Sequence, residues 1–204
     1  MRLLECEYIN SIIFCELNLL KNKTSEKNKL TTGVIVGNCM IDGKKILLIQ
    51  FDKSYKMGTI GVPEGEIITL AFEYAIKKKL PVIAIAASGG IRVNEGTLAL
   101  MQMTKMASAV KQHSDKGLLF ISIVTNPTLG GTSASFISLA DIIIAEKGAV
   151  YGFSGKRIII DTTYEQLPDD FQTAEYAKQH GMVDIVAEKS EIKNIVSKLL
   201  KIHK

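Results

Sequence analysis

The sequence has no tryptophan, and only three cysteines and four prolines among its 204 residues. Cys6, Cys15 and Cys39 form no C-x-x-C pair and have no histidine at metal-ligand spacing, so we expect neither a zinc site nor a disulfide framework. No apolar run reaches the roughly 18 residues of a membrane span, and the start of the chain lacks the pattern of a signal peptide. We therefore expect a cytoplasmic protein without membrane contact.

The chain also lacks a strong charge of one sign. Its 25 lysines and arginines against 21 acidic residues give a net charge of +4. The basic residues are scattered, and no aromatic residues alternate with them, so no nucleic-acid partner is expected. With 47% hydrophobic residues, a chain of this length can bury a hydrophobic core that needs no disulfide or metal to support it.

The order of local patterns predicts an α/β domain. Residues 1–30 are expected to form a peripheral N-terminal arm, and residues 31–204 the domain itself. Two β-rich runs flank Asp42 and Gly43, a dipeptide that favours a type I′ hairpin. Helical and continuous apolar runs then alternate, as is typical of strands buried on both faces of a sheet.

The two middle helices have predicted apolar faces. A helix beginning at Pro63 ends in a run of lysines that complements its dipole. The next helix, after Glu95, is predicted to bury one helically spaced set of residues: Leu100, Met103, Ala107 and Val110.

Familiar catalytic motifs are missing. Neither G-x-G-x-x-G after a strand nor G-x-x-x-x-G-K-[ST] is present, and "GFSGK" lacks the spacing of a nucleophile elbow. His113, His180 and His203 lie in polar helical surroundings, so we interpret them as solvated surface residues. Nothing in the sequence marks a triad base.

Two glycine pairs are the candidate site. Gly89-Gly90 and Gly130-Gly131 each follow a buried strand and introduce a helix. Parallel strands would bring both pairs to the carboxyl edge of the sheet, where open α/β sheets bind ligands. Helix N-termini there would offer unpaired N–H groups to a developing oxyanion. The same glycines could instead serve only to permit tight turns.

From about Thr32 to Leu200 the chain resembles the β subunit of bacterial acetyl-CoA carboxylase carboxyltransferase, a family of the ClpP/crotonase superfamily. The resemblance implies a crotonase-like fold of repeated ββα units that stabilises thioester enolates. It rests on six ordered segments: "ASGGIRVNEG", "LALMQMTKMASA", "TNPTLGGTSASFISLADIIIAE", "GFSGKRII", "LPDDFQTAEY" and "HGMVDIV".

The resemblance also implies a reaction. Gly130 and Gly131 would hold the thioester oxygen of an acyl-CoA, with Gly89 and Gly90 as the neighbouring wall or companion donor. In the family reaction a carboxyl group moves between carboxybiotin and acetyl-CoA or malonyl-CoA, in fatty acid or polyketide biosynthesis. Biotin is carried on a biotin carboxyl carrier protein. An α-type subunit supplies the carboxybiotin site, so an α2β2 hetero-oligomer is expected.

Several side chains near the glycine motifs have two interpretations. Arg92 and Arg157 each follow such a motif and are predicted to bind phosphate or carboxylate, the alternative being a surface ion pair. Glu95 is interpreted as a charge that complements a helix dipole. The family's N-terminal zinc ribbon needs four cysteines, which Cys6 and Cys15 cannot supply, so no zinc is expected.

Two other functions stay open. One is a biotin-independent, crotonase-like decarboxylase or isomerase of acyl thioesters; the other is a non-catalytic paralogue that binds an α-like subunit. A hydratase is disfavoured, because Ala134, Ser135 and "YGFSGK" offer no pair of carboxylates for acid and base work. The acyl chain, and whether the thiol belongs to CoA or a carrier protein, are also open.

Overall fold

The computed structural model describes residues 18–19, 32–164 and 166–203. Seven strands form one mixed sheet whose spatial order is the order of the sequence. The first three strands pair antiparallel, and every pair from β3 to β7 is parallel. The strands are β1 (Asn18–Leu19), β2 (Val34–Ile41), β3 (Lys44–Phe51), β4 (Val82–Ser88), β5 (Phe120–Thr128), β6 (Ile142–Glu146) and β7 (Ile185–Ala187).

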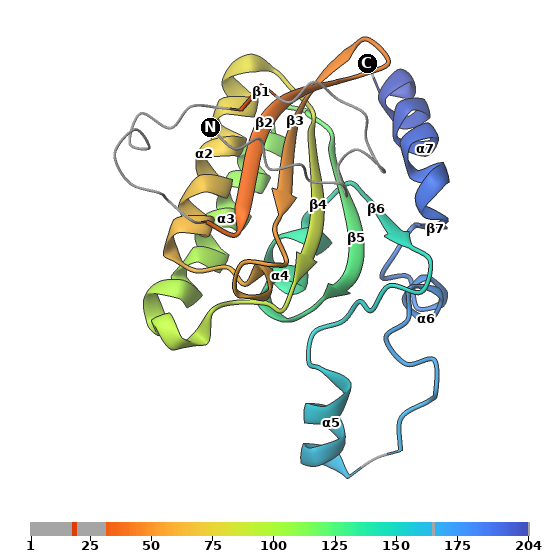
Figure 1. Cartoon of the computed structure of the whole chain (residues 1–204). Coiled ribbons are helices and arrows are strands. Elements are labelled where there is room, and N and C mark those ends of the chain that lie inside the picture. The colour runs from red at the N-terminus through yellow and green to blue at the C-terminus, as the bar shows by residue number, and fades with distance from the viewer. Residues whose placement is uncertain (1–17, 20–31, 165, 204) are drawn as a thin grey trace.

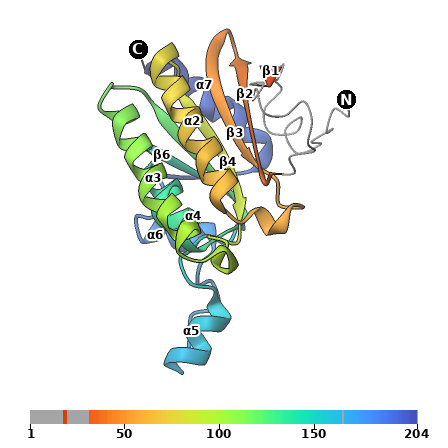
Figure 2. The same ribbon diagram turned by 90° about the vertical axis from the view of Figure 1, so that its left-hand side faces the viewer.

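Helices cover both faces of this sheet. Figures 1 and 2 show α2 and α3 side by side on one face and α7 on the other, while α5 projects from the body. The helices are α2 (Val62–Lys78), α3 (Thr97–Ser114), α4 (Gly130–Ser135), α5 (Lys156–Thr163), α6 (Ala174–Gln179) and α7 (Lys189–Ile202).

The predicted hairpin is present between β2 and β3. Asp42 and Gly43 have φ values of 46° and 81°, the positive values that a type I′ turn requires. The Asp42 carboxylate also accepts a hydrogen bond from Ser197 Oγ at 2.6 Å. This hydrogen bond connects the hairpin to helix α7, which lies near the other end of the sequence.

Apolar side chains pack on both faces of the sheet. Phe72 of α2 meets Phe120 of β5 edge to face, with ring centroids 5.1 Å apart, and Phe136 packs against both. On the opposite face, Val196 and Leu200 of α7 pack in a second buried cluster. Burial on two faces explains why the strand sequences are continuously apolar.

The prediction that His113 is a solvated surface residue is wrong. Its ring is fully buried, contacts Phe72 edge to face at 5.3 Å, and forms a hydrogen bond between Nε2 and the Leu80 carbonyl at 3.0 Å. Burial lowers the pKa of His113, although the Leu80 hydrogen bond opposes that change. A signal was available, because Met106, Val110 and His113 lie at helical spacing on one face of α3.

The predicted buried face of α3 is displaced by about one residue. Val110 is buried as predicted, but the other buried residues include Ala99, Gln102 and Met106, whereas Leu100 is half exposed. Gly65 of α2 explains which face of α3 is buried. A Cβ on Gly65 would lie 2.5 Å from Gln102 Cβ, so α2 and α3 approach each other closely at Gln102.

Residues 1–30 were predicted to form a peripheral N-terminal arm, and the structure describes two of them. These two, Asn18–Leu19, form the edge strand β1, paired with Gly37 and Asn38; the remainder of that segment lies outside the described residues, so the arm stays a prediction. Cys39, in β2, is disulfide-bonded, which contradicts the expectation of no disulfide. Spacing alone does not reveal a bridge between cysteines that are distant in the sequence.

The ββα repeat is complete only in its first unit, β2-β3-α2. Isolated bridges also pair Ile60 with Ile91, and Thr128 at the end of β5 with Tyr151. These bridges lie next to the two glycine pairs in the sequence, so they brace the segments that carry them.

Candidate active site

The structure brings the two glycine pairs into contact. They follow β4 and β5, which are parallel neighbours. A Cβ built on Gly90 would lie 3.1 Å from Gly130 Cα, and one built on Gly130 would lie 3.0 Å from Gly90 Cα. Gly90 and Gly130 also have positive φ values of 112° and 66°. Glycine is therefore required both by the backbone conformation and by the approach of the two turns.

Most of the predicted N–H donors in these turns already have acceptors. Gly89 N–H donates to Met57 O at 3.0 Å, and Gly130 N–H donates to Phe153 O at 2.8 Å. Gly90 N–H donates to Ser88 Oγ at 3.1 Å.

Gly131 is the exception, since none of the described residues accepts a hydrogen bond from its N–H. Helix α4 is six residues long, so its dipole contributes less than the sequence suggested.

Buried hydroxyl groups lie behind both turns. Ser88 Oγ and Thr132 Oγ1 are 2.7 Å apart, and both residues are fully buried. Ser133 Oγ donates to Gly130 O at 2.7 Å, and Ser135 Oγ donates to Gly131 O at 2.6 Å. Sequence reasoning missed these residues, although Ser88 directly precedes the first pair and Thr132 directly follows the second.

Arg92, predicted to bind substrate, is held by internal partners. Its side chain is 6% exposed, and Nη2 lies 3.1 Å from Glu64 Oε1 while Nη1 donates to Glu95 Oε1 at 2.7 Å. Nη2 also donates to the Thr59 carbonyl at 2.7 Å. Burial would lower the pKa of Arg92, but the two carboxylates outweigh it and raise that pKa. This geometry makes Arg92 a brace between the first glycine turn and helix α2.

Glu64, which sequence reasoning also missed, is the centre of that brace. Its carboxylate is 1% exposed and accepts hydrogen bonds from Gly33 N–H at 3.1 Å and Gly61 N–H at 2.9 Å. Burial would raise the pKa of Glu64, but the hydrogen bonds from Gly33, Arg92 and Gly61 together lower it. Glu95 was interpreted as an early residue of the following helix, but it lies before α3, and its carboxylate accepts from Val62 N–H at the start of α2 at 2.9 Å.

The structure does not bring Arg157 to the glycine turns. It lies on α5, the helix that projects from the body (Figure 1), and its side chain is 93% exposed. Its Nε is 3.7 Å from Asp161 Oδ2, a surface pair one helical turn away. The prediction that Arg157 binds substrate stays a prediction.

Exposed apolar side chains surround the glycine turns. Met57 and Phe153, whose carbonyls accept from the glycine amides, are both exposed, as are Val93 and Leu98 after the first pair. Beside the second pair is a cavity of about 330 Å³, lined by residues that include Ser133, Tyr151, Phe153 and Met182. Apolar surface gathered at a site edge is typical of an interaction surface.

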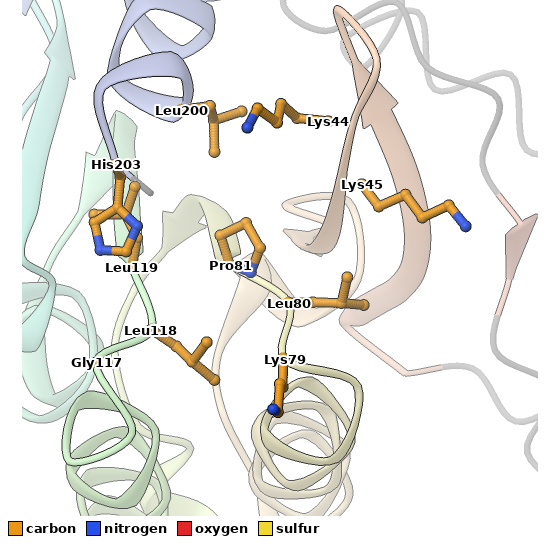
Figure 3. A pocket seen from close by; sticks show the side chains of 10 residues that line it. All are labelled: Lys44, Lys45, Lys79, Leu80, Pro81, Gly117, Leu118, Leu119, Leu200 and His203. Carbon is orange, nitrogen blue, oxygen red and sulfur yellow. The ribbon is translucent and has the colours of Figure 1, made fainter.

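A second cavity of about 330 Å³ lies at the opposite end of the strands (Figure 3). On its wall, Lys44 begins β3 and Pro81 immediately precedes β4. This cavity therefore lies at the amino ends of these strands, away from the glycine turns at their carboxyl ends. Figure 3 shows Lys44 and Lys45 extending in opposite directions, so their ammonium groups do not converge on one anion.

Among the described residues, no group of three or more His, Cys, Asp or Glu side chains could hold a metal ion. No described helix combines the length and the apolarity that crossing a bilayer requires.

The fold and the paired glycine turns define a crotonase-like α/β protein. The family model of the carboxyl transferase domain matches residues 9–200. The chain belongs to this family, and the fold class predicted from the sequence is confirmed. The family match begins within the segment expected to be an N-terminal arm.

Two curated relatives agree with this assignment. The chain is 48% identical over 182 residues to acetyl-coenzyme A carboxylase carboxyl transferase subunit beta 1 of Lachnospira eligens, covering 87% of this chain and 71% of that protein. It is 45% identical over 174 residues to the subunit beta of Prochlorococcus marinus, covering 85% of this chain and 59% of that protein. The resemblance noted in the sequence is therefore confirmed.

A transcarboxylase 12S crystal structure with hydrolysed methylmalonyl-coenzyme A bound matches with a TM-score of 0.80 and 26% identity. The match covers 95% of this chain and 40% of that one. The chain thus corresponds to part of a longer protein in this case, and to roughly three fifths of the Prochlorococcus relative.

Proposed function

We propose that this chain is the β-type half of a biotin-dependent carboxyltransferase and binds the acyl-CoA substrate. The observation that carries the proposal is the contact between two glycine turns beside an N–H group, that of Gly131, for which the described residues offer no acceptor. The family membership supplies the reaction class. Acetyl-CoA and malonyl-CoA are the proposed substrate pair.

Gly131 N–H is the proposed primary donor to the thioester oxygen. When the Cα of the thioester loses a proton or its carboxyl group leaves as CO2, the electron pair stays on the thioester and negative charge develops on that oxygen. A donor fixed by the surrounding fold stabilises this charge without reorganising, and loss of one such donor costs about 10²- to 10³-fold in rate. Gly90 N–H is the proposed companion, shared between Ser88 Oγ and the oxyanion.

The chain's other groups hold this arrangement. The Gly89 and Gly130 amides fix the turns to the loops at Met57 and Phe153, and the Arg92 brace fixes the loop after the first pair. The acyl-CoA half of the reaction thus fits the described residues. Carboxybiotin, when bound, supplies the carboxyl group and a nitrogen base.

We place the carboxybiotin site on an α-type partner, in an α2β2 assembly served by a biotin carboxyl carrier protein. Helix α5 supports this partner. It has no buried residue, exposes Ile158 and Ile160, and at eight residues is too short to be stable alone in water. A partner that covers α5 would bury these side chains and bring Arg157 into an interface, where it could bind phosphate or carboxylate as predicted.

Reconstitution tests this proposal. The chain, an α-type subunit and the two together are each assayed for conversion of malonyl-CoA to acetyl-CoA, with and without biocytin as acceptor. Turnover that needs both chains and biocytin is expected. Turnover by this chain alone without biocytin would replace the proposal with a decarboxylase, and a stable but inactive complex would replace it with a non-catalytic subunit.

A further inference from the structure

We propose that Ser88 and Thr132 are positioning residues that set the spacing between the two glycine turns. This inference rests on the proposed function, because it concerns how the oxyanion donors are held. Neither side chain reaches solvent, so neither is proposed to contact the substrate.

Ser88 is tied to the second turn by two hydrogen bonds. Its carbonyl accepts from Leu129 N–H at 2.9 Å, and its hydroxyl lies 2.7 Å from Thr132 Oγ1. The β4–β5 register also shifts between Ala86 and Ser88, so the pair of Ser88 and Thr128 lies beyond the regular ladder, which ends at Ala86 and Val124. The side-chain bond therefore adds to the backbone bond from Leu129 at the point where the turns begin.

The same hydroxyl fixes the first turn, because Ser88 Oγ accepts from Gly90 N–H at 3.1 Å. One oxygen atom thus connects Gly90 to Thr132, the neighbour of Gly131. A buried hydroxyl pair of this kind rigidifies its surroundings when its members are satisfied. Displacement of either hydroxyl would change the separation of the Gly90 and Gly131 amides.

The kinetic test uses Ser88→Ala and Thr132→Val in the reconstituted complex. Misplacing a donor costs up to about a hundredfold, so kcat should fall about tenfold to hundredfold while KM for the CoA thioester stays within about twofold. The double variant should fall no further than the worse single one, because both act through one bond. Thr132→Ser, which keeps the hydroxyl, should retain activity.

Ser122→Ala is the matched control. Ser122 is also fully buried on β5, but its hydroxyl donates to Ile137 O at 3.2 Å and contacts neither turn. Its kcat should match that of the unmodified protein. Unchanged or raised kcat in Ser88→Ala would overturn the proposal, since it would mean that the serine merely competes for Gly90 N–H. Equal losses in Ser88→Ala and Ser122→Ala would also overturn it.

Amide hydrogen exchange tests the positioning role independently of activity. In the purified chain, the Gly90 amide should exchange at least about tenfold faster in Ser88→Ala than in Ser122→Ala, because the hydrogen bond that protects it is lost. It should also exchange faster in Thr132→Val than in Ser122→Ala, because Ser88 Oγ then loses the hydroxyl partner that fixes its position. If the unmodified complex fails to transfer carboxyl groups, the proposed function fails while this comparison still decides the inference. Equal exchange of the Gly90 amide in the unmodified chain and in these three variants would refute the positioning role.

Discussion

Arg92→Met removes the central cation from a buried charged network. Methionine keeps much of the side-chain volume but leaves the carboxylate of Glu64 without its guanidinium partner. That carboxylate is 1% exposed and keeps its backbone hydrogen bonds, among them those from Gly33 and Gly61, but no cation. The substitution therefore tests whether Arg92 is a structural brace, as its contacts indicate.

The expected loss of stability is large. Breaking a buried ion pair by removing one partner typically costs about 3–5 kcal/mol, because a buried charge is left uncompensated. For a chain of about 200 residues, each kcal/mol lowers the melting temperature by about 2–4 °C. Arg92→Met should therefore lower the melting temperature by about 6–20 °C. The double variant Arg92→Met/Glu64→Gln should recover part of that loss, since it also removes the uncompensated charge.

The pH dependence has a definite sign. The pKa of Glu64 is lowered in the folded chain from its ordinary value of 4.5. Its stabilising contribution is therefore complete above that value and is lost as the pH falls through the folded-state pKa. Because Arg92→Met removes one of the groups that lower this pKa, the stability difference between variant and parent should shrink below about pH 4.5.

Thermal unfolding followed by circular dichroism across this pH range measures both effects. Lys105→Met is the matched control, because Lys105 forms an exposed ion pair with Glu66 on the neighbouring helix. An exposed pair contributes about 0–1 kcal/mol, so its loss should shift the melting temperature by no more than about 4 °C. The reasoning is refuted if Arg92→Met melts within that margin.

Three further predictions follow from other parts of the fold. Gly65→Ala should destabilise the chain by about 1–3 kcal/mol in chemical denaturation, because its Cβ would overlap Gln102, whereas Gly155→Ala, with open space around it, should change stability far less. The stability of the parent should fall as pH drops below 6.5, since the pKa of His113 is lowered by burial, and His113→Leu should flatten that slope in calorimetry. Ile158→Asp should abolish co-purification with the α-type subunit while leaving the melting temperature of the isolated chain within about 2 °C, as expected for an exposed position.

The meeting of the glycine turns could be predicted from the sequence because it depends on topology. A buried strand followed by two glycines and a helix, repeated once, places both pairs at one edge wherever the strands are parallel. The hairpin at Asp42 was predictable for a similar local reason, since few dipeptides tolerate two positive φ values.

Which of the glycine N–H groups already have hydrogen-bond acceptors could not be predicted in this way. The acceptors of the Gly89 and Gly130 amides are carbonyls at Met57 and Phe153, which lie in separate loops and carry no sequence signal for this role. Arg92 likewise gained a structural role from Glu64, 28 positions earlier in the chain. Position after a glycine motif therefore indicated proximity to the site, but not which groups the side chain would contact.

The prediction of which face of α3 is buried failed for a different reason. This helix carries apolar residues on more than one side, and periodicity alone could not choose between them. The choice came from tertiary packing at Gly65, which draws Gln102 inward and leaves Leu98 and Leu100 exposed.

The most direct test of the account is the ¹⁵N–¹H resonance of Gly131 in the reconstituted complex during titration with acetyl-CoA. A thioether analogue that lacks the carbonyl oxygen is titrated in parallel. We expect acetyl-CoA to shift the Gly131 amide and the analogue to leave it nearly unchanged, because the thioester oxygen accepts that hydrogen bond. An amide that does not move with bound acetyl-CoA, or that moves equally with both compounds, would contradict the assignment of Gly131 as the oxyanion donor.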